Sequence, residues 1–459
     1  MGRLKRRLTS WFNRSRRRLS TMQIIALVFA GIILLGTCLL MLPVSTRSGE
    51  GCDFLSALFT ATSATCVTGL TMYDTWTQWS GFGQVVILCM IQIGGLGFMS
   101  MASMGVFLLR KKVGLKQRLV MAQALSLKDM DGVIKVQKTV LLGSFTLEAL
   151  GALVLTLRFL PEVGLWQALK WGIFHSVSAF CNAGFDIFGS ITPGASLMEF
   201  QSDPVVLITL SLLVIIGGLG FLVWEEVSRI RRFRKFSVYT KLVLLTTLVL
   251  LVGGTLAVCA LEWNNPGTLG SMHWTDKLLN GFFHSTSMRT AGFASIDQAA
   301  LTDGGKGLSI LLMFLGGASG STAGGAKIVT VVILLMFVWN RATGRSHISI
   351  FKRSIPDQQV LDAMTIVSVM VVLVIFGGIF ITATSPVGLL DAMYESVSAL
   401  CTVGVTAGAT GNLSLAAKLL IIVYMYFGRV GILTISLGFL MGNQAEERFR
   451  YAKTNLLIG

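Results

Sequence analysis

The stretch that decides the fold is FHSVSAFCNAGF at residues 174–185, because the chain contains three further versions of it. They read FTATSATCVTGL at 59–70, FFHSTSMRTAGF at 282–293 and YESVSALCTVGV at 394–405. In each version an aromatic residue precedes a glycine by ten positions, with serine and other small residues between them. The spacings between the glycines Gly69, Gly184, Gly292 and Gly404 are 115, 108 and 112 residues. One regular period therefore predicts four copies of a single structural unit.

A second feature recurs with the first, 24 to 33 residues after each of these glycines. It is a glycine cluster that reads GGLGF at 94–98, GGLGF at 217–221, GGASG at 316–320 and GRVG at 428–431. Each unit is predicted to hold a transmembrane helix, a short re-entrant segment that ends at the first glycine, and a second transmembrane helix with the cluster. The fold class predicted is an all-α membrane protein with eight transmembrane helices and four re-entrant pore half-helices around a central pore.

The composition supports a membrane protein. Of the 459 residues, 53% are hydrophobic and 13% are charged, whereas roughly a quarter are charged in a soluble domain. Stretches without charge such as 21–46 and 204–224 reach the ~20 residues that a spanning helix needs. A further span at about 139–160 contains Glu148 and Arg158. The first apolar run, 23–42, is longer than the ~7–15 residues of a signal-peptide core, so a retained first helix is expected.

The charges predict the topology of these spans. The net charge is +16, and basic residues cluster in the N-terminal segment, the two loops around 110–138 and 229–241, the segment 341–353 and the C-terminal segment. The positive-inside rule assigns all five segments, with both termini, to the cytoplasm. The opposite segments are rich in acidic residues, including Asp74, Asp186 and Asp297, and would concentrate cations at an entrance. Topology alone also depletes such segments of lysine and arginine.

The chain is therefore divided as follows: 1–20 basic cytoplasmic N-terminus, 21–110 first repeat, 111–136 basic cytoplasmic loop, 137–228 second repeat, 229–238 basic cytoplasmic loop, 239–340 third repeat, 341–361 cytoplasmic segment, 362–442 fourth repeat and 443–459 cytoplasmic C-terminus.

The repeated glycines point to chemistry carried by the backbone. A single such glycine would be typical of helix packing, but four at one period favour a pore. Non-helical backbone at membrane depth is tolerated where it lines a water-filled cavity. Glycine adopts positive φ without a steric penalty, and rings of carbonyl oxygens replace the hydration shell of a monovalent cation. The negative C-terminal ends of the half-helices would favour cations as well.

These four units, with the filters VTGL, NAGF, TAGF and TVGV, resemble the Trk/Ktr/HKT superfamily of potassium transporters over about residues 20–445. The chain begins directly with its first repeat, so it looks most like the membrane subunit of a Ktr-type system. Glycine at all four filter positions, without the serine of the sodium-selective plant branch, implies a preference for potassium. The resemblance implies that potassium binds at a selectivity filter made of Val67, Thr68, Gly69, Asn182, Ala183, Gly184, Thr290, Ala291, Gly292, Thr402, Val403 and Gly404.

The third repeat departs from the others after its filter. The run GGASGSTAGGA at 316–326, followed by Lys327, is dense in glycine, and each glycine weakens a helix by up to ~1 kcal/mol relative to alanine. Two half-helices joined by a loop at membrane depth are expected, and the residues alone leave open a gate or a packing kink. The resemblance implies an intramembrane gate that comprises Gly316, Gly317, Ser319, Gly320, Ser321, Thr322, Gly324, Gly325, Lys327 and Arg429.

The fourth repeat departs at Arg429, where the others have Gly95, Gly218 and Gly317. A charge within a span costs at least ~2.5 kcal/mol and indicates a function, with a structural salt bridge as the alternative. Arg429 is expected to hydrogen-bond the glycine-rich loop and to add a positive barrier. Arg289, before the third filter, is interpreted as a brace that bonds neighbouring carboxylates.

Other polar residues are predicted to be structural. Glu148 and Arg158 are too far apart for a pair within one helix, so each is expected to face a neighbouring helix or the interface. His175 and His284 lack the grouping that a metal site needs. The seven cysteines form no CxxC pair and are interpreted as packing residues. No cofactor is expected on this chain.

The sequence thus predicts a potassium uptake protein of the cell membrane, driven by the membrane potential, and not an enzyme. The resemblance implies a homodimer, a cytoplasmic nucleotide-binding regulatory ring and stimulation by sodium. The lipid bilayer is a further expected partner, and no nucleic-acid partner is expected. Any nucleotide control would reside on a partner, because no phosphate-binding GxGxxG follows a strand. Three alternatives remain: an alternating-access carrier, an intramembrane enzyme, and sodium as the main permeant ion.

Overall fold

The computed structural model describes residues 21–97, 133–230, 232–344, 348–351 and 353–431. The predictions made for the basic N-terminal segment, for most of the loop 111–136 and for the chain after residue 431 lie outside the described residues. Within the described part the chain is mainly helical with almost no sheet, and the order of its helices follows the predicted repeat.

Each repeat begins with a long apolar helix. These first helices are α2 (Thr21–Leu40), α8 (Val133–Phe180), α11 (Val238–Glu262) and α15 (Asp357–Thr384). All four are long and apolar enough to cross a membrane. Helix α8 contains a break at Gly164, where φ is 75° and ψ is 167°. It therefore comprises the first helix of the second repeat and the re-entrant half-helix that follows it.

The re-entrant segments are short helices, here called the pore helices. They are α3 (Phe54–Thr65), the part of α8 after Gly164, α12 (Trp274–Ser287) and α16 (Leu389–Leu400). Helices α3 and α16 have 12 residues each, or about 18 Å at 1.5 Å per residue, which is too short to cross ~30 Å of hydrocarbon. Helix α3 begins where the side chain of Asp53 accepts a hydrogen bond from the backbone N–H of Ser56, as an N-cap does.

The second helix of each repeat ends at its glycine cluster. These helices are α5 (Gly81–Leu96), α9 (Pro204–Gly218), α13 (Asp303–Phe314) and α17 (Leu415–Val430). Helices α5 and α17 end at Gly97 and Gly431, whose φ angles are 81° and 96°. In the third repeat the helix resumes as α14 (Ile328–Ala342). The predicted pair of half-helices is present, and residues 315–327 between them are called the intramembrane loop below.

The second repeat differs from the continuous span expected at 204–224. Helix α9 is followed by α10 (Phe221–Ile230), and the two are bent by 95°. Gly220 supplies the bend with a φ of 87°. The intramembrane loop lies against this bend, because the N–H of Phe221 donates to the carbonyl of Gly320. The sequence predicts a break in the third repeat only. Contact between the intramembrane loop of that repeat and α10 accounts for the additional bend in the second repeat.

The remaining elements are short. Helix α4 (Thr75–Gln78) and the 3-10 helices η1 (Pro43–Ser45), η2 (Phe188–Ser190), η3 (Met198–Phe200), η4 (Phe233–Lys235) and η5 (Thr410–Asn412) lie in connections. Strands β1 (Ser349–Ile350) and β2 (Arg353–Ser354) form an antiparallel pair in which Ser349 lies opposite Ser354.

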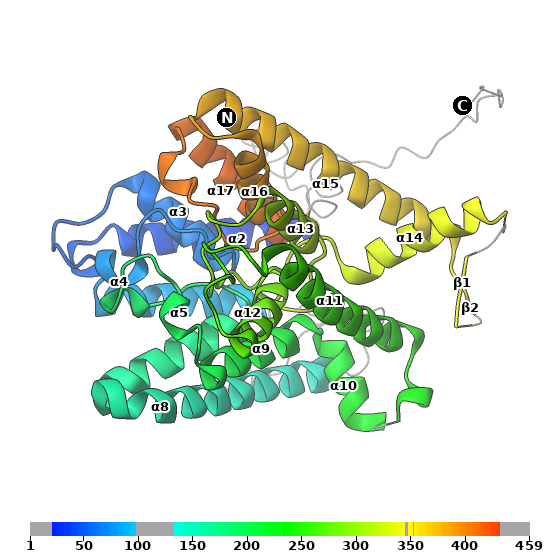
Figure 1. The fold of residues 1–459 in the computed structure, drawn as a ribbon, viewed down its shortest axis with the longest axis horizontal. Helices are drawn as coiled ribbons and strands as arrows, with labels where there is room; N and C mark the ends of the chain where they lie inside the picture. Colours follow the sequence, from blue (N-terminus) through cyan, green and yellow to red (C-terminus); the bar gives the residue numbers. More distant parts are fainter. Residues whose placement is uncertain (1–20, 98–132, 231, 345–347, 352, 432–459) are drawn as a thin grey trace, which may run out of the picture.

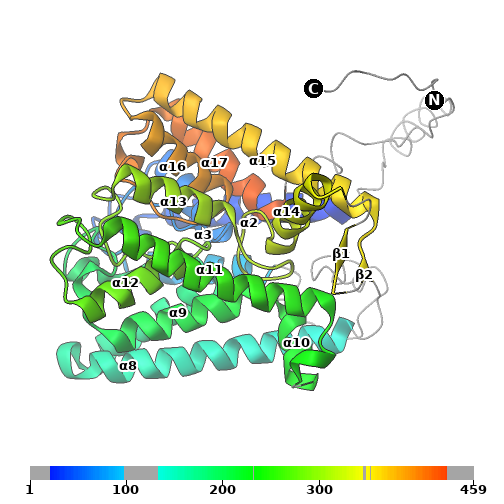
Figure 2. The same ribbon diagram turned by 45° about the vertical axis from the view of Figure 1, so that its right-hand side comes forward.

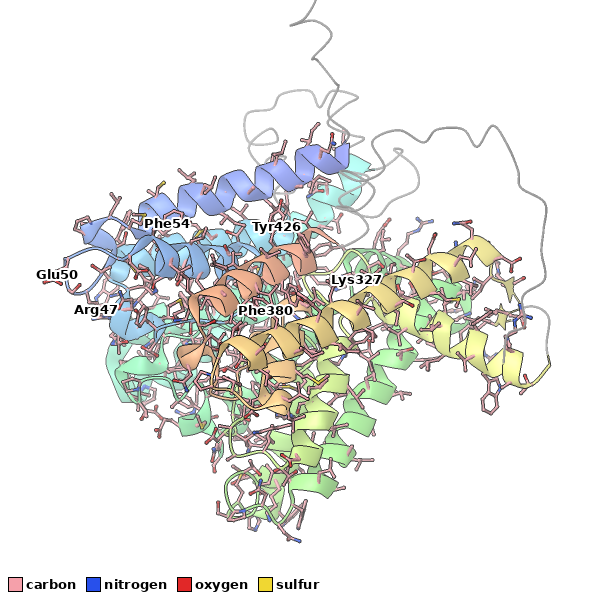
Figure 3. All side chains as sticks on the ribbon, turned by 90° about the horizontal axis from the view of Figure 1, so that it is seen from above. Arg47, Glu50, Phe54, Lys327, Phe380 and Tyr426 are labelled. Atoms are coloured by element: carbon pink, nitrogen blue, oxygen red, sulfur yellow. The ribbon has the colours of Figure 1, made fainter. Side chains whose placement is uncertain are left out.

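The repeats are arranged around the middle of the bundle (Figure 1). One end carries α4 and the turn within α8, and the other end carries α10, α14 and the β-hairpin; Figure 2 shows the same separation after a turn. We call the end with α4 the vestibule end, after a cavity described below, and the end with α10 and α14 the basic end. In Figure 3, Arg47 and Glu50 lie at the vestibule end and Lys327 lies near the middle.

Burial is inverted relative to a soluble protein. The outer faces of the first helices carry exposed apolar side chains, such as Leu142 at 67% and Val249 at 66% exposure. The pore helices bury polar ones instead, and Ser63, Ser178 and Ser398 have no exposed area. This pattern is expected when lipid surrounds the bundle and the backbone and polar groups are satisfied inside it.

Candidate ion pathway

The four pore loops share one backbone conformation. The glycines Gly69, Gly184, Gly292 and Gly404 have φ angles of 98°, 70°, 85° and 100°. Two positions earlier, Val67, Asn182, Thr290 and Thr402 have φ angles of 56°, 58°, 66° and 51°. A residue other than glycine rarely adopts positive φ. Its recurrence at four equivalent positions shows that the loops follow the same path.

The loops meet at one axis, as the space around the glycines shows. A Cβ on Gly69 would lie 2.5 Å from the carbonyl oxygen of Ala183, one on Gly184 would lie 2.8 Å from that of Ala291, one on Gly292 would lie 2.5 Å from that of Val403, and one on Gly404 would collide with that of Thr68. Each glycine thus faces the carbonyl of the next repeat. Four glycines and four carbonyl oxygens alternate in a ring that has no room for a side chain.

Serines of the pore helices hold this ring in place. The hydroxyl of Ser63 accepts from the N–H of Gly69, and that of Ser398 accepts from the N–H of Gly404, both at 3.1 Å. Ser178 donates to the carbonyl of Phe185 at 2.7 Å. In the third repeat, Ser287 lies one position later and donates to Phe293. Buried and hydrogen-bonded in this way, the loops are rigidly supported.

A cavity of about 340 Å³, here called the vestibule, opens above the ring. The four glycines of the ring line it together with Asp74, Asp186 and Asp297. These carboxylates come from three different repeats, and each was among the acids predicted to face an entrance. Burial, and then the negative charge of Asp74, raise the pKa of Asp186 to about 7. The vestibule is an anionic approach to the ring of carbonyls.

Below the ring, the intramembrane loop is bound to the second repeat. The N–H groups of Ala318 and Thr322 donate to the carbonyls of Gly218 and Gly217 at 3.0 and 3.3 Å. The hydroxyl of Thr322 donates to the side-chain oxygen of Asn182, a residue of the predicted filter, at 3.1 Å. From the start of α11, the hydroxyl of Tyr239 donates to the carbonyl of Ser319 at 3.0 Å.

Contacts within the loop close it on itself. Its two ends meet where the N–H of Gly316 donates to Ala326 and that of Ile328 donates to Gly317, at 3.0 and 3.1 Å. Ser321 donates to the carbonyl of Ala318, and the ammonium of Lys327 donates to that of Ala323, both at 2.7 Å. Gly320 and Gly325 have φ angles of 69° and 67°. Gly324 packs so closely on the hydroxyl of Thr402 that a Cβ would collide with it.

Arg429 joins this loop to the first repeat. Its Nη1 donates to the carbonyl of Thr322 at 2.5 Å, and its Nη2 donates to those of Gly94 and Gly95. The expected hydrogen bond to the loop is therefore present. No carboxylate of the described chain pairs with Arg429, so the salt-bridge alternative finds no partner there.

Arg289 does not have the partners predicted for it. It was expected to bond neighbouring carboxylates, but none of the described carboxylates forms an ion pair with it. Its guanidinium lies beside the pore helix, where Nη2 makes a long hydrogen bond of 3.4 Å to the hydroxyl of Thr247. The prediction was wrong because the acidic side chains of the vestibule lie above the ring. Arg289 precedes the predicted filter residues, and its guanidinium is directed toward Thr247.

Glu148 and Arg158, which both lie in α8, have side-chain partners in the bundle. Both carboxylate oxygens of Glu148 accept from the side-chain amide of Gln92 on α5, at 2.9 Å. Arg158 pairs with Glu162 at 2.6 Å and with Asp203 at 2.7 Å. Each contacts another helix or a surface position, as expected.

The two predicted structural histidines are hydrogen-bonded inside the bundle. His175 contacts the carbonyl of Trp171 at 2.7 Å and the N–H of Ile187 at 3.2 Å. His284 contacts the hydroxyl of Ser309 at 2.9 Å. In the described ranges no group of three or more histidine, cysteine or acidic side chains is placed to hold a metal ion.

Sequence reasoning did not find what the glycine clusters contact. A Cβ on Gly94, Gly217 or Gly428 would collide with the carbonyl of Thr65, Phe180 or Leu400 respectively. Each of those carbonyls lies four residues before a glycine of the ring. The clusters therefore let the second helices approach the ends of the pore helices. The recurrence of a glycine cluster 24 to 33 residues after each repeated glycine was the signal available in the sequence.

Comparison with known proteins gives consistent relatives. A family model described as a cation transport protein (TrkH) matches residues 9–449. The chain is 42% identical over 433 residues to the Ktr system potassium uptake protein B of Bacillus subtilis, covering 94% of this chain and 96% of that protein. It is 39% identical over 457 residues to the potassium/sodium uptake protein NtpJ of Enterococcus hirae, covering 98% and 100%.

Among solved structures, the potassium transporter TrkH from Vibrio parahaemolyticus matches with a TM-score of 0.71. That match covers 92% of this chain and 86% of the other at 18% identity, and it shows a shared fold.

The fold and the site together define an all-α, multi-pass membrane protein with pore loops around one axis. The chain belongs to the TrkH family of cation transport proteins, and its relatives include Ktr-type subunits. The relatives are transporters, so the prediction that the chain is not an enzyme is confirmed.

Proposed function

We propose that this chain takes up potassium across the cell membrane through a gated, channel-like pore. The observation that carries the proposal is the ring in which Gly69, Gly184, Gly292 and Gly404 alternate with the carbonyls of Thr68, Ala183, Ala291 and Val403. Such a ring replaces the hydration shell of a monovalent cation. The names of the relatives from Bacillus subtilis and Enterococcus hirae both include potassium uptake, which supports potassium as the cargo.

The filter in this proposal comprises residues 67–69, 182–184, 290–292 and 402–404. Their carbonyls provide the ligands, and the vestibule supplies the negative potential that draws cations toward them. The membrane potential drives inward flow with about 2.3 kcal/mol per charge per 100 mV. Potassium is the transported substrate, and the proposal needs no resident cofactor.

The gate in this proposal is the intramembrane loop with Arg429. Its contacts with Asn182 and Thr402 keep the loop directly below the ring. Arg429 adds a positive charge to the same place and holds the carbonyl of Thr322, so a cation leaving the filter meets both a steric and an electrostatic barrier. Opening requires the loop to leave these contacts.

Orientation and partners complete the proposal. The vestibule end faces outward and the basic end faces the cytoplasm, with both termini inside, because the basic segments follow the positive-inside rule. A homodimer, a cytoplasmic nucleotide-binding regulatory ring and sodium stimulation are carried over from the resemblance to Ktr-type systems. The basic loops are the surface on which such a ring would dock.

Sodium as the main permeant ion is the second candidate. It is favoured by the relative from Enterococcus hirae, whose name includes sodium as well as potassium. Carbonyl rings tune the preference between the two ions and do not dictate it. Direct comparison of the two fluxes separates the candidates.

The test is growth rescue of a bacterium that lacks potassium uptake, at low millimolar potassium, with rubidium and sodium influx recorded in parallel. Wild type is compared with Gly69→Ser and Gly404→Ser. We expect rescue by wild type and weaker rescue with less discrimination between rubidium and sodium in both variants. Variants that transport as well and as selectively as wild type would contradict the filter. If the membrane-inserted wild type fails to rescue, co-expression with a Ktr-type regulatory subunit distinguishes a missing partner from a wrong function.

A further inference from the structure

Arg289 is a buried cation that the pathway described above does not use. Its exposed fraction is 7%. Its one side-chain hydrogen bond within the described chain is the long contact of Nη2 with Thr247, and its Nε has no partner. A guanidinium carries five N–H donors, and an uncompensated buried charge is strongly destabilising. A side chain of this kind needs acceptors that the present conformation does not provide.

The position of Arg289 links it to the gate. It lies three residues before Gly292, where the other repeats have Cys66, Cys181 and Cys401. The third repeat is thus the one with a cation at this position, and it is also the one whose second helix is interrupted by the intramembrane loop. Two departures from the repeat occur together in one unit.

Packing around the third repeat is also different. In the other repeats the first glycine of the cluster covers a carbonyl at the end of the pore helix. The equivalent Gly316 does not, since the nearest atoms to its Cβ position belong to Gly324 and Gly325 of its own loop. Backbone of the intramembrane loop, and not a carbonyl of the pore helix, therefore packs against the start of this glycine cluster.

A cavity of about 10 Å³ lies between the end of the third pore helix, α9 and the intramembrane loop. Arg289 lines it together with Gly317 of the intramembrane loop and Gly218 at the bend after α9. Thr286, Val214 and Ile215 complete the lining. A volume of this size holds about one water-sized atom, which is also the size of a single carbonyl oxygen.

We propose that Arg289 is a second anchor for the intramembrane loop and that it acts in the conducting state. When the loop leaves Arg429, a loop carbonyl near Gly317 enters the cavity and accepts hydrogen bonds from the guanidinium of Arg289. The glycines of the loop permit the change in backbone angles. The loop then has two positions, each held by one arginine, and this inference rests on the proposed function of the loop as a gate.

Such an anchor makes Arg289 a positioning residue, with consequences that differ from those of a filter residue. Its removal disfavours the conducting position, so the maximal flux falls by about tenfold, within the usual range of coupling between two states. The half-saturating rubidium concentration and the preference for rubidium over sodium do not change, because the filter is untouched. Lysine retains the charge but not the fork of donors, and so restores part of the flux.

The test measures rubidium uptake into proteoliposomes that contain the full chain, comparing wild type, Arg289→Met and Arg289→Lys. Each is also made in a background that lacks residues 318–325, which joins two loop ends that already share hydrogen bonds. We expect the loss caused by Arg289→Met in the intact chain and no loss in the background without the loop. Cys66→Ser, at the equivalent position of a repeat without a gate loop, serves as the control and should transport like wild type.

A second variant keeps the inference testable if the shortened chain does not fold. In Arg289→Met/Arg429→Ala both anchors are missing, so the flux should lie between those of the two single variants. Equal losses with and without the loop, an altered ion preference, or no loss at all would overturn the inference. Absence of rubidium uptake by the wild-type chain, also after a Ktr-type regulatory subunit is reconstituted with it, would instead overturn the proposed function, and the inference with it.

Discussion

The pore loops of the four repeats are alike, whereas the second helices that follow them are not. The loops share positive φ at Gly69 and at its three counterparts, and each is supported by a serine of its pore helix. Among the second helices, α5 and α17 end at a glycine, α9 bends by 95°, and α13 gives way to the intramembrane loop.

This difference separates two tasks. A ring of carbonyls around one axis needs the same backbone conformation from every repeat, because a pore loop with a different conformation would distort the ring. A gate needs a single element that moves relative to its surroundings. The polar side chains that break the repeat, Arg429, Arg289 and Lys327, accordingly lie below or beside the ring and not in it.

Among substitutions in the four similar pore loops, Gly404→Ala should have the largest effect on transport. Gly404 has a φ of 100°, and a Cβ there would collide with the carbonyl of Thr68. We expect rubidium uptake to fall by roughly a hundredfold or more, because the carbonyl ring can no longer close around the ion. Uptake into proteoliposomes at matched protein levels measures the effect.

Gly411→Ala is the matched control for this variant. Gly411 belongs to the same repeat, and nothing lies within 4 Å of its Cβ position. It should transport like wild type. Selective uptake by Gly404→Ala would show that the ring is not the filter.

Arg429→Ala tests the proposed gate, which belongs to the part of the molecule that differs between repeats. The substitution leaves the carbonyls of Thr322, Gly94 and Gly95 without this partner, at about 1–3 kcal/mol for each buried acceptor that stays unpaired. We expect basal rubidium uptake to rise by about tenfold, a change equivalent to ~1.4 kcal/mol in gating, together with a lower melting temperature. Arg429→Lys should be intermediate.

Arg158→Ala is the control, since that arginine pairs with Glu162 and Asp203 in partly exposed positions. Pairs of this kind contribute about 0–1 kcal/mol. A basal flux in Arg429→Ala no higher than that of Arg158→Ala would remove Arg429 from the gate.

The smallest effect is expected at the vestibule, where Asp186 is predicted to sense pH. Its pKa is raised to about 7 by burial and by Asp74, so the carboxylate is charged above that pH and neutral below it. As the pH on the vestibule side falls through 7, the half-saturating potassium concentration should rise by about twofold, because less negative potential draws cations in. Flux measured from pH 6 to 8 tests this.

In Asp186→Asn the pH dependence should disappear. The sign for stability is the opposite of that of a salt-bridged acid. A raised pKa means that the folded chain binds more protons, so stability falls as the pH rises from the usual carboxyl range toward 7. The asparagine variant should therefore lose less stability than wild type between pH 5 and 8. An unchanged pH profile would exclude Asp186 as the titrating group.

Several features could be read from particular residues before the structure was known. The four glycines and their spacing predicted the repeat, and the glycine-rich run at 316–326 predicted the interruption between α13 and α14. The contact between Arg429 and the loop followed from aligning the repeats. The bend after α9 was not predicted, since GGLGF is identical in the first and second repeats and only contact with the intramembrane loop distinguishes them.

The sequence by itself determined the class of protein, the four units and the positions of the four repeated glycines, because hydropathy and repetition are local properties of the chain. Only the tertiary structure decided which groups meet: Thr322 with Asn182, Arg429 with two repeats, and Arg289 with a cavity where carboxylates had been expected. The physical reason is that these contacts join segments more than 100 residues apart or depend on the space between helices. A charged residue within an apolar repeat predicts a buried partner, but tertiary packing alone decides which group, if any, it contacts.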